Sequence, residues 1–243
     1  MCYFNSLVAP KGATITLSGT TKQLDPTNRP LQSGFSYHNW PIVKGSTENF
    51  TIENAHWELI APWVKTTQEV QVGREKFNTL NATAERLFES KLFKPAALNN
   101  RCLVLSSGFY EWRHYKPAGA IKEIAYPYFI TIKEQSLFYM AGIFQPWTDK
   151  ETGETMDTFS IVTTKANAFM EQIHNKKKRM PTILTEAQAS EWLNPCLSES
   201  KIMELASITY DANQLSAYTL DKCFRTASNP MDAFDYPELP GLI

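Results

Sequence analysis

Cys2 has the most distinctive chemistry in the chain, because removal of Met1 would leave it as the first residue. Aminopeptidases that remove an initiator methionine act when the second residue is small, and cysteine qualifies. The new terminus carries an α-amine and a thiol on adjacent carbons. The α-amine titrates at about pH 7.7–8.0, so part of it is neutral at pH 7 and adds to an aldehyde. The thiol can then close on the imine to give a five-membered thiazolidine ring. The alternative is that Cys2 is only a small core residue of a first strand.

Glu111 is a candidate acid or base. Residues 101–112 read as a single strand. By period-two alternation, one face of that strand carries Leu103, Leu105, Ser107, Phe109 and Glu111, and Glu111 is the last of them. That face is mainly apolar, and desolvation there raises the pKa of a carboxyl group. A raised pKa suits a general acid or base near neutral pH. The alternative is a glutamate at the strand end, turned to solvent or paired with Arg113.

His174 lies four residues after Met170, at the end of a predicted amphipathic helix, and a basic run follows it. A protonated histidine is stabilised near a helix C-terminus by the helix dipole. Beside this basic run it is placed to meet a phosphate or an abasic sugar. We therefore predict DNA contacts from the run itself, which consists of Lys176, Lys177, Lys178 and Arg179. The alternative is a helix-terminating histidine followed by solvated charges.

Asn81 and two tryptophans are weaker candidates. Asn81 precedes a predicted helix, so its amide is either an N-cap or a hydrogen-bonding group for a substrate hydroxyl. Trp57 and Trp63 flank Ala61-Pro62 on a predicted loop. Exposed tryptophans stack on unpaired bases for about 1–3 kcal/mol per base. The alternative for both is ordinary packing in the core.

Other chemistries lack a sequence pattern. The remaining histidines show no metal-ligand spacing, and no GxSxG, phosphate loop or dinucleotide fingerprint is present, so we expect neither a metal nor a cofactor. The chain has 24 basic and 25 acidic residues, so a nucleic-acid site must be a local patch. Four cysteines without CxxC spacing, and no secretion signal or long apolar run, predict free thiols, no membrane contact and a cytoplasmic, DNA-associated protein.

Five short motifs together resemble the SOS-response-associated peptidase (SRAP) family, also called abasic-site processing proteins. They occur in the family's order and extend from residue 1 to about residue 225: Met1-Cys2, Leu80-Asn81-Ala82, Gly108-Phe109-Tyr110-Glu111-Trp112, Ile161-Val162-Thr163-Thr164, and Ile173-His174 with Arg179-Met180-Pro181. The Gly-Phe-Tyr-Glu-Trp block and the initial Met-Cys are specific together. The resemblance favours the functional interpretation of Cys2, Glu111 and His174 over the alternatives.

The resemblance implies a protein that binds single-stranded DNA and forms a ring-closed covalent adduct between its N-terminal cysteine and an abasic deoxyribose. Such an adduct shields the lesion from strand cleavage. By residue matching, Cys2 would be the nucleophile and Asn81 would hydrogen-bond the sugar or the ring. Glu111 would move protons during ring opening and dehydration, and His174 would contact the lesion and assist proton transfer, including reversal. The resemblance also implies barrel-like sheets.

Three departures from the family pattern concern phosphate contacts. The family often begins Met-Cys-Gly-Arg, whereas Cys2 is followed here by Tyr3-Phe4-Asn5, without an arginine. The family's Asn-Ala-Arg is Asn81-Ala82-Thr83 here. Compared with the common His-x-Arg-Met-Pro, three extra residues separate His174 from Arg179. We interpret the added lysines as a redistribution of phosphate contacts.

The elements that must position these residues follow from their periodicity. Besides the run at 101–112, strand-like segments occur at 126–133, 137–144 and 158–164, with hairpin loops at 116–119 and 149–153. Helical patterns begin near Asn81 and Ala166, a capping box at Thr185 opens a helix to about Leu193, and another helix spans 199–206. Residues 11–30 read as an exposed excursion, and the tail from about 226 to 243 as extended.

This pattern predicts an α+β fold: one β-rich domain over residues 1–243, with mostly antiparallel sheets and a few packed helices. Three functions fit it. The first is an abasic-site sensor that crosslinks to single-stranded DNA through Cys2, with strand-cleaving lyase activity as a side reaction. The second is a thiol peptidase that acts on its own N-terminus or on other proteins, with Cys2 as nucleophile and His174 as base. The third is a non-covalent binder of single-stranded or modified DNA. The sequence names no protein partner.

Overall fold

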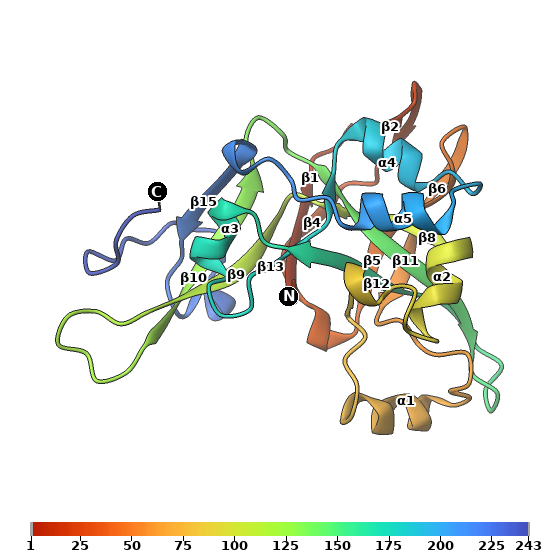
Figure 1. The fold of residues 1–243 in the computed structure, drawn as a ribbon, viewed down its shortest axis with the longest axis horizontal. Helices are drawn as coiled ribbons and strands as arrows, with labels where there is room; N and C mark the ends of the chain where they lie inside the picture. Colours follow the sequence, from red (N-terminus) through yellow and green to blue (C-terminus); the bar gives the residue numbers. More distant parts are fainter. Residues whose placement is uncertain (1, 243) are drawn as a thin grey trace.

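The computed structural model describes residues 2–242, and its strands form two main sheets with the amino terminus between them (Figure 1). The smaller sheet is antiparallel throughout and has five strands, in the order β15 (Leu215–Thr219), β10 (Ile124–Ile132), β9 (Gly108–Tyr115), β1 (Phe4–Ala9) and β4 (Thr27–Ser33). A separate hairpin pairs β2 (Thr14–Leu17) with β3 (Thr20–Gln23).

The larger sheet closes into a barrel. Its ring consists of β12 (Thr155–Lys165), β6 (Asn49–Trp57), β5 (Asn39–Ser46), β8 (Arg101–Ser106) and β11 (Phe138–Thr148), and the β11–β12 pairing completes it. Three short strands extend it, namely β7 (Asn81–Thr83), β13 (Arg179–Pro181) and β14 (Ile183–Leu184). Only β6 and β7, both beside β12, are paired in parallel among the described strands. The predicted β-rich, largely antiparallel and barrel-like fold is therefore confirmed.

Five α-helices of six to eight residues cover the sheets in the described part of the chain. They are α1 (Thr67–Arg74), α2 (Phe93–Asn99), α3 (Ala168–Ile173), α4 (Glu186–Trp192) and α5 (Glu199–Ala206). The capping box predicted at Thr185 is present, because its hydroxyl accepts from Gln188 N while the Gln188 side chain accepts from Thr185 N. The helix predicted over 199–206 is α5, and α3 confirms the pattern that begins near Ala166. No helix among residues 2–242 is long and apolar enough to cross a membrane.

The run at 101–112 is two strands rather than one, so the prediction of a single strand face was wrong. The chain leaves the barrel after Ser106, turns at Ser107, and enters the small sheet at Gly108. Two serine hydroxyl groups take part in the hydrogen bonds at the crossing. Val8 N donates to Ser107 Oγ (3.0 Å), and Ser106 Oγ donates to Asn5 Oδ1 (2.7 Å). A side chain at Gly108 would collide with the Phe129 ring at 2.2 Å. Period-two alternation cannot detect such a change of sheet.

The helix predicted to begin near Asn81 is absent, and Asn81 is not an N-cap. Asn81–Thr83 is the strand β7, followed by a single 3-10 turn at Ala84–Arg86, and the helix begins only at Phe93. The apolar spacing that suggested a helix has another cause: Ala84 and Leu87 are fully buried because the turn packs them into the core. Pairing of β7 with β12 outweighed local helix propensity.

The segment 11–30 and the C-terminal tail differ in how well they were predicted. Residues 11–30 are not an exposed excursion, because they contain β2, β3 and the start of β4, and they bury Ile15, Leu17 and Leu24. The tail after η4 (Phe224–Thr226) has no strand or helix up to residue 242, apart from one isolated bridge at Ala233. It is held by hydrogen bonds such as that from Tyr126 to Glu238 (2.9 Å).

Candidate functional site

Cys2 lies two residues before the start of β1 and is fully buried. Its thiol contacts the carbonyl oxygen of Phe4, with Sγ at 3.9 Å. Burial, and secondly the negative charge of Glu111, raise the pKa of the Cys2 thiol well above its ordinary range. The thiol is therefore protonated at neutral pH. Its ring-closing reaction needs a group that removes its proton.

Glu111 occupies the fourth position of β9, beside Tyr128 of β10, and is 4% exposed. Burial raises the pKa of this carboxyl group to about 7. Both protonation states are therefore populated near neutral pH, which suits proton transfer in either direction. The alternative in which Glu111 turns to solvent is excluded by its burial.

His174 is the C-cap residue of α3, 7% exposed, and its Nε2 lies 3.8 Å from Glu111 Oε2. Its Nδ1 is 2.7 Å from the carbonyl oxygen of Arg179, which can only accept, so Nδ1 carries the proton of the neutral ring. Burial lowers the pKa of His174 to about 4. The ring is therefore neutral at pH 7, so the helix dipole does not stabilise a charged His174 here. Its Nε2 lone pair faces Glu111.

Asn81 approaches from the barrel. It begins β7, pairs with Ile161 of β12, and is 6% exposed. Neither its Nδ2 nor its Oδ1 has a hydrogen-bond partner among the described residues. A buried amide without partners is costly, so Asn81 is a candidate for hydrogen bonding to a ligand.

Gly34 connects the Asn81 strand to the chain around Cys2. Its backbone N donates to the carbonyl oxygen of Tyr3 (2.8 Å). On its other side, a Cβ added to Gly34 would lie 3.1 Å from the Leu80 side chain and 3.2 Å from Trp57. This close packing holds the residue after Cys2 against the residue before Asn81. Gly34 thus connects the segment that carries Cys2 to the barrel segment that carries Asn81.

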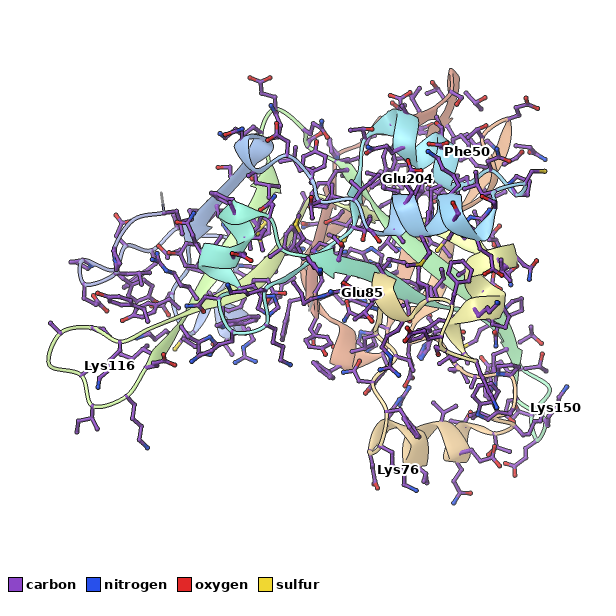
Figure 2. All side chains as sticks on the ribbon, in the orientation of Figure 1. Phe50, Lys76, Glu85, Lys116, Lys150 and Glu204 are labelled. Atoms are coloured by element: carbon purple, nitrogen blue, oxygen red, sulfur yellow. The ribbon has the colours of Figure 1, made fainter. Side chains whose placement is uncertain are left out.

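A cleft of about 630 Å³ opens beside Asn81. Its walls come from the end of β6, from α1 and from the turns around β7, and Figure 2 shows Lys76 on this side of the molecule. Trp63 and Phe77 line it and are 58% and 71% exposed. Its cationic lining residues are Lys76, Arg86 and Lys91. Exposed aromatic rings with nearby cations are the features that bind unpaired bases and their phosphates.

Of the two predicted stacking tryptophans, only Trp63 is available. Trp57 is fully buried, stacks on Phe159 with ring centroids 6.1 Å apart, and donates from its indole N to Leu80 O (3.1 Å). The prediction that Trp57 contacts DNA was wrong, because it ends β6 with its ring directed into the core.

The cations of the basic run after His174 differ in their ion pairs. Lys176 pairs with Glu123 (2.5 Å), Lys178 with Glu171 (3.6 Å), and Arg179 makes two hydrogen bonds to Glu85 (2.7 and 2.9 Å). Arg179 also donates to Thr163 O (2.6 Å), so its main visible role is to hold β13 and the His174 turn in place. Lys177 makes no ion pair with a described carboxylate, and its charge acts on both Glu111 and His174.

Several functional candidates were not found from the sequence. Phe77, Arg86 and Lys91 line the cleft but belong to no motif. Asn175 is a second example: its side chain accepts from His114 N (3.0 Å) and donates to His114 O (2.7 Å). These two hydrogen bonds fix the start of the inserted turn against β9. The only sequence signal for Asn175 was its position inside the insertion. No group of three metal-binding side chains occurs among residues 2–242.

Comparisons with known proteins identify a family and several relatives. The model of the SOS response associated peptidase (SRAP) family matches residues 8–225. The abasic site processing protein YoqW of Bacillus subtilis is 33% identical over 188 residues, which are 77% of each chain. The abasic site processing protein HMCES of Pongo abelii is 30% identical over 161 residues, covering 57% of this chain and 44% of that protein.

Solved structures share the architecture. A crystal structure of a protein from Bacteroides thetaiotaomicron has a TM-score of 0.79 at 34% identity and covers 95% of this chain and 97% of that one. A phage-related protein from Bordetella bronchiseptica has a TM-score of 0.67 at 18% identity, which shows the fold alone.

Proposed function

The chain belongs to the SOS response associated peptidase (SRAP) family, and on that premise we propose that it captures abasic sites in single-stranded DNA as a covalent thiazolidine on Cys2. The observation that carries the proposal is the burial of Cys2, Glu111 and His174 in one cluster, with the His174 and Glu111 side chains 3.8 Å apart. Beside them lies Asn81, whose amide has no partner among the described residues. Removal of Met1 is required first, because it frees the α-amine of Cys2.

The first chemical step joins the Cys2 amine to the aldehyde of the ring-opened abasic sugar. The nitrogen attacks the carbonyl carbon, a proton passes to the oxygen, and the resulting carbinolamine loses water to form an imine. Glu111, with its pKa raised to about 7, is available in its protonated form to protonate the departing hydroxyl group. The Nε2 lone pair of neutral His174 faces this carboxyl group at 3.8 Å and is placed to orient it.

The second step closes the ring. The Cys2 sulfur attacks the imine carbon, the thiol loses its proton, and the imine nitrogen gains one, so the adduct differs from its two reactants by one water. Because burial keeps the thiol protonated, the carboxylate of Glu111 is the base that this step needs. The amide of Asn81 would hydrogen-bond a sugar hydroxyl or the ring. Elimination from the imine instead of ring closure would cleave the strand, which makes a lyase activity a side reaction.

The raised thiol pKa weighs against the alternative of a thiol peptidase. Such a mechanism requires a thiolate activated by a basic histidine. Here His174 has its pKa lowered to about 4 and faces Glu111. A protease or hydrolase activity is therefore proposed only as a secondary possibility, limited to the exposure of Cys2. A purely non-covalent DNA binder would leave the buried aminothiol without a role.

The binding surfaces proposed for the strand are the cleft, with Trp63 and Phe77, and the basic run, in which Lys177 is the cation not engaged in an ion pair with a described carboxylate. Bases flanking the lesion would stack on the aromatic rings, and phosphates would meet the lysines. Unpaired bases are needed for such stacking, which favours single-stranded over duplex DNA. The arginine that the family carries after Asn-Ala is replaced by Thr83, and the lysines inserted after His174 take over its charge.

The test is adduct formation with an abasic single-stranded oligonucleotide, without a reducing agent, followed by heating and a denaturing gel. The Cys2→Ser variant keeps the amine, so it should give an adduct only when borohydride traps the imine. The wild-type protein should give a heat-stable adduct without borohydride. A heat-stable, unreduced adduct of Cys2→Ser at the wild-type level would refute the ring-closing role of the thiol.

A further inference from the structure

The β9–β10 hairpin carries a basic, exposed tip that the proposed chemistry does not use. Its loop spans residues 116–123, and Figure 2 shows Lys116 on this projecting segment, away from the rest of the molecule. Ile121 at its tip is 91% exposed, the largest exposure among the large apolar side chains described. Such an exposed isoleucine on a hairpin contributes nothing to the core. It is available for contact with a partner.

The inserted turn adds further cations beside this hairpin. The hairpin loop and the inserted turn together form what we call the basic arm, residues 116–123 and 176–178. The arm contains five lysines and one glutamate, an excess of four positive charges in a chain whose net charge is −1. Its exposed lysines are Lys116, Lys122, Lys176, Lys177 and Lys178. This projecting region therefore carries a local excess of positive charge.

The arm is held in a fixed relation to the catalytic cluster. Asn175 binds both backbone groups of His114, and Lys176 pairs with Glu123, so the two parts of the arm are joined at two points. Strand β9 also leads directly from Glu111 to the hairpin. The four residue steps from Glu111 to Tyr115 extend about 13 Å at about 3.3 Å per residue. The hairpin loop therefore starts about four nucleotides from the lesion, at about 3.4 Å per nucleotide of a stacked strand. The inserted turn lies closer, because it begins two residues after His174.

We propose that the basic arm binds the phosphate backbone of the DNA that flanks the captured lesion, on one side only, with the inserted turn near the lesion and the hairpin loop beyond about four nucleotides. The inference rests on the proposed function, because it assumes that the lesion lies at Glu111. The positive charge of the arm is complementary to a polyanion. Because β9 connects the arm to the cluster, the polyanion is the DNA strand already bound at the cluster. Ile121 would pack against a sugar or a base edge of the same strand.

The experiment measures binding of single-stranded oligonucleotides that carry a tetrahydrofuran, an abasic analogue without an aldehyde. Two series extend the DNA from 2 to 10 nucleotides, one on the 5′ side and the other on the 3′ side. Wild-type affinity should rise with length on one side only. The double variant Lys116→Ala and Lys122→Ala should lose about tenfold in affinity for the long oligonucleotides of that series. Its salt dependence should fall by about 1.4 in slope, since each phosphate contact on a single strand contributes about 0.7.

A matched control is the double variant Lys11→Ala and Lys22→Ala, which removes two lysines from the β2–β3 hairpin region. It should bind like the wild type. Ile121→Ser should weaken binding to the long oligonucleotides two- to fivefold with an unchanged salt slope. Equal affinity of the arm variant and the wild type for long oligonucleotides would overturn the inference. An equal loss for the shortest ones would do the same.

Covalent capture separates this inference from the proposed function. The arm variant should still form the heat-stable adduct with a short abasic oligonucleotide, because Cys2 and Glu111 are unchanged. A protein that forms no adduct but shows the length-dependent binding would refute the proposed chemistry and leave the arm supported. A protein that forms the adduct but shows no arm effect would refute the arm alone.

Discussion

The catalytic cluster and the neighbouring cleft differ in their relation to water. Cys2, Glu111 and His174 are at most 7% exposed, whereas Trp63 and Phe77 on the cleft are 58% and 71% exposed. In the cluster, burial sets reactivity, because it shifts the pKa values of all three groups. In the cleft, exposed rings provide contact area for a strand. Under the proposed function, the cluster would determine the rate of capture and the cleft would determine affinity.

Replacing Glu111 should have the largest effect and should act on rate alone. The Glu111→Gln variant cannot exchange a proton, so its adduct formation should slow by about 10²-fold or more. The residual rate should also lose the pH dependence centred near 7. Quenched time courses with an abasic oligonucleotide across pH 5–9 measure both. Affinity for the tetrahydrofuran analogue should stay within about twofold. If that affinity fell as far as the rate, the division between cluster and cleft would be wrong.

The same variant should reveal the energetic cost of the buried carboxylate. Burial raises the pKa of Glu111 from 4.5 to about 7, so the folded state holds its proton more tightly than the unfolded state. The wild-type protein therefore loses stability as pH rises through this window, by up to about 3 kcal/mol at about 1.4 kcal/mol per pKa unit. Glu111→Gln has no such penalty, so its stability relative to wild type should increase from pH 4.5 to pH 7.

Urea denaturation at several pH values measures this difference in stability. His174 is present in both proteins, so its own contribution cancels in the difference. Glu123→Gln provides the control, because that carboxylate is exposed and paired with Lys176. Its stability relative to wild type should not increase over the same window. A Glu111→Gln difference that stayed constant with pH would show that the carboxyl group is not destabilised by burial.

Removing an aromatic ring from the cleft should weaken binding without slowing the chemistry. Trp63→Ala should raise the Kd for the tetrahydrofuran oligonucleotide about tenfold, which is within the 1–3 kcal/mol typical of one base stacked on an aromatic ring. Fluorescence anisotropy measures the Kd, and single-turnover adduct formation at saturating protein measures the rate. Val72→Ala on α1, a residue 50% exposed, serves as a control that should change neither quantity. A slower saturated rate for Trp63→Ala would place this ring in the chemistry.

The smallest effect is expected at Lys177. Lys177→Ala removes a cation without a described ion-pair partner, so the slope of log affinity against log salt should fall by about 0.7, and affinity should fall two- to threefold. Lys178→Ala should change the slope less, because Lys178 pairs with Glu171. Binding titrations at 50–200 mM salt compare the two. Equal slopes for both variants would show that the ion pair does not distinguish them.

The sequence predicted the members of the cluster better than their surroundings, because Cys2, Glu111 and His174 are all buried and His174 lies beside Glu111. Cys2, Glu111 and His174 were found from residue type and order, and the β-rich class followed from periodicity. Asn81 was placed at the start of a helix, because local spacing carries no information about the pairing of β7 with β12, more than 70 residues away in the chain. For the same reason the sequence did not give the charge state of His174, since its burial depends on elements distant in sequence.

The binding surfaces were predicted less well. Trp57 and Trp63 are equivalent by composition and spacing, yet one ends a barrel strand and the other lies on an exposed turn. The basic run was predicted as a unit, but its ion-pair partners Glu85, Glu123 and Glu171 come from three separate segments. Which cation remains for DNA is thus a property of tertiary structure.

The intact mass of the protein after incubation with an abasic single-stranded oligonucleotide tests the central claim most directly. The account predicts a heat-stable species whose mass equals the protein without Met1 plus the oligonucleotide minus one water. Cys2→Ala should give no such species without a reducing agent. A stable adduct that retains Met1, or one formed equally by Cys2→Ala, would contradict the assignment of Cys2 as the residue that captures the lesion.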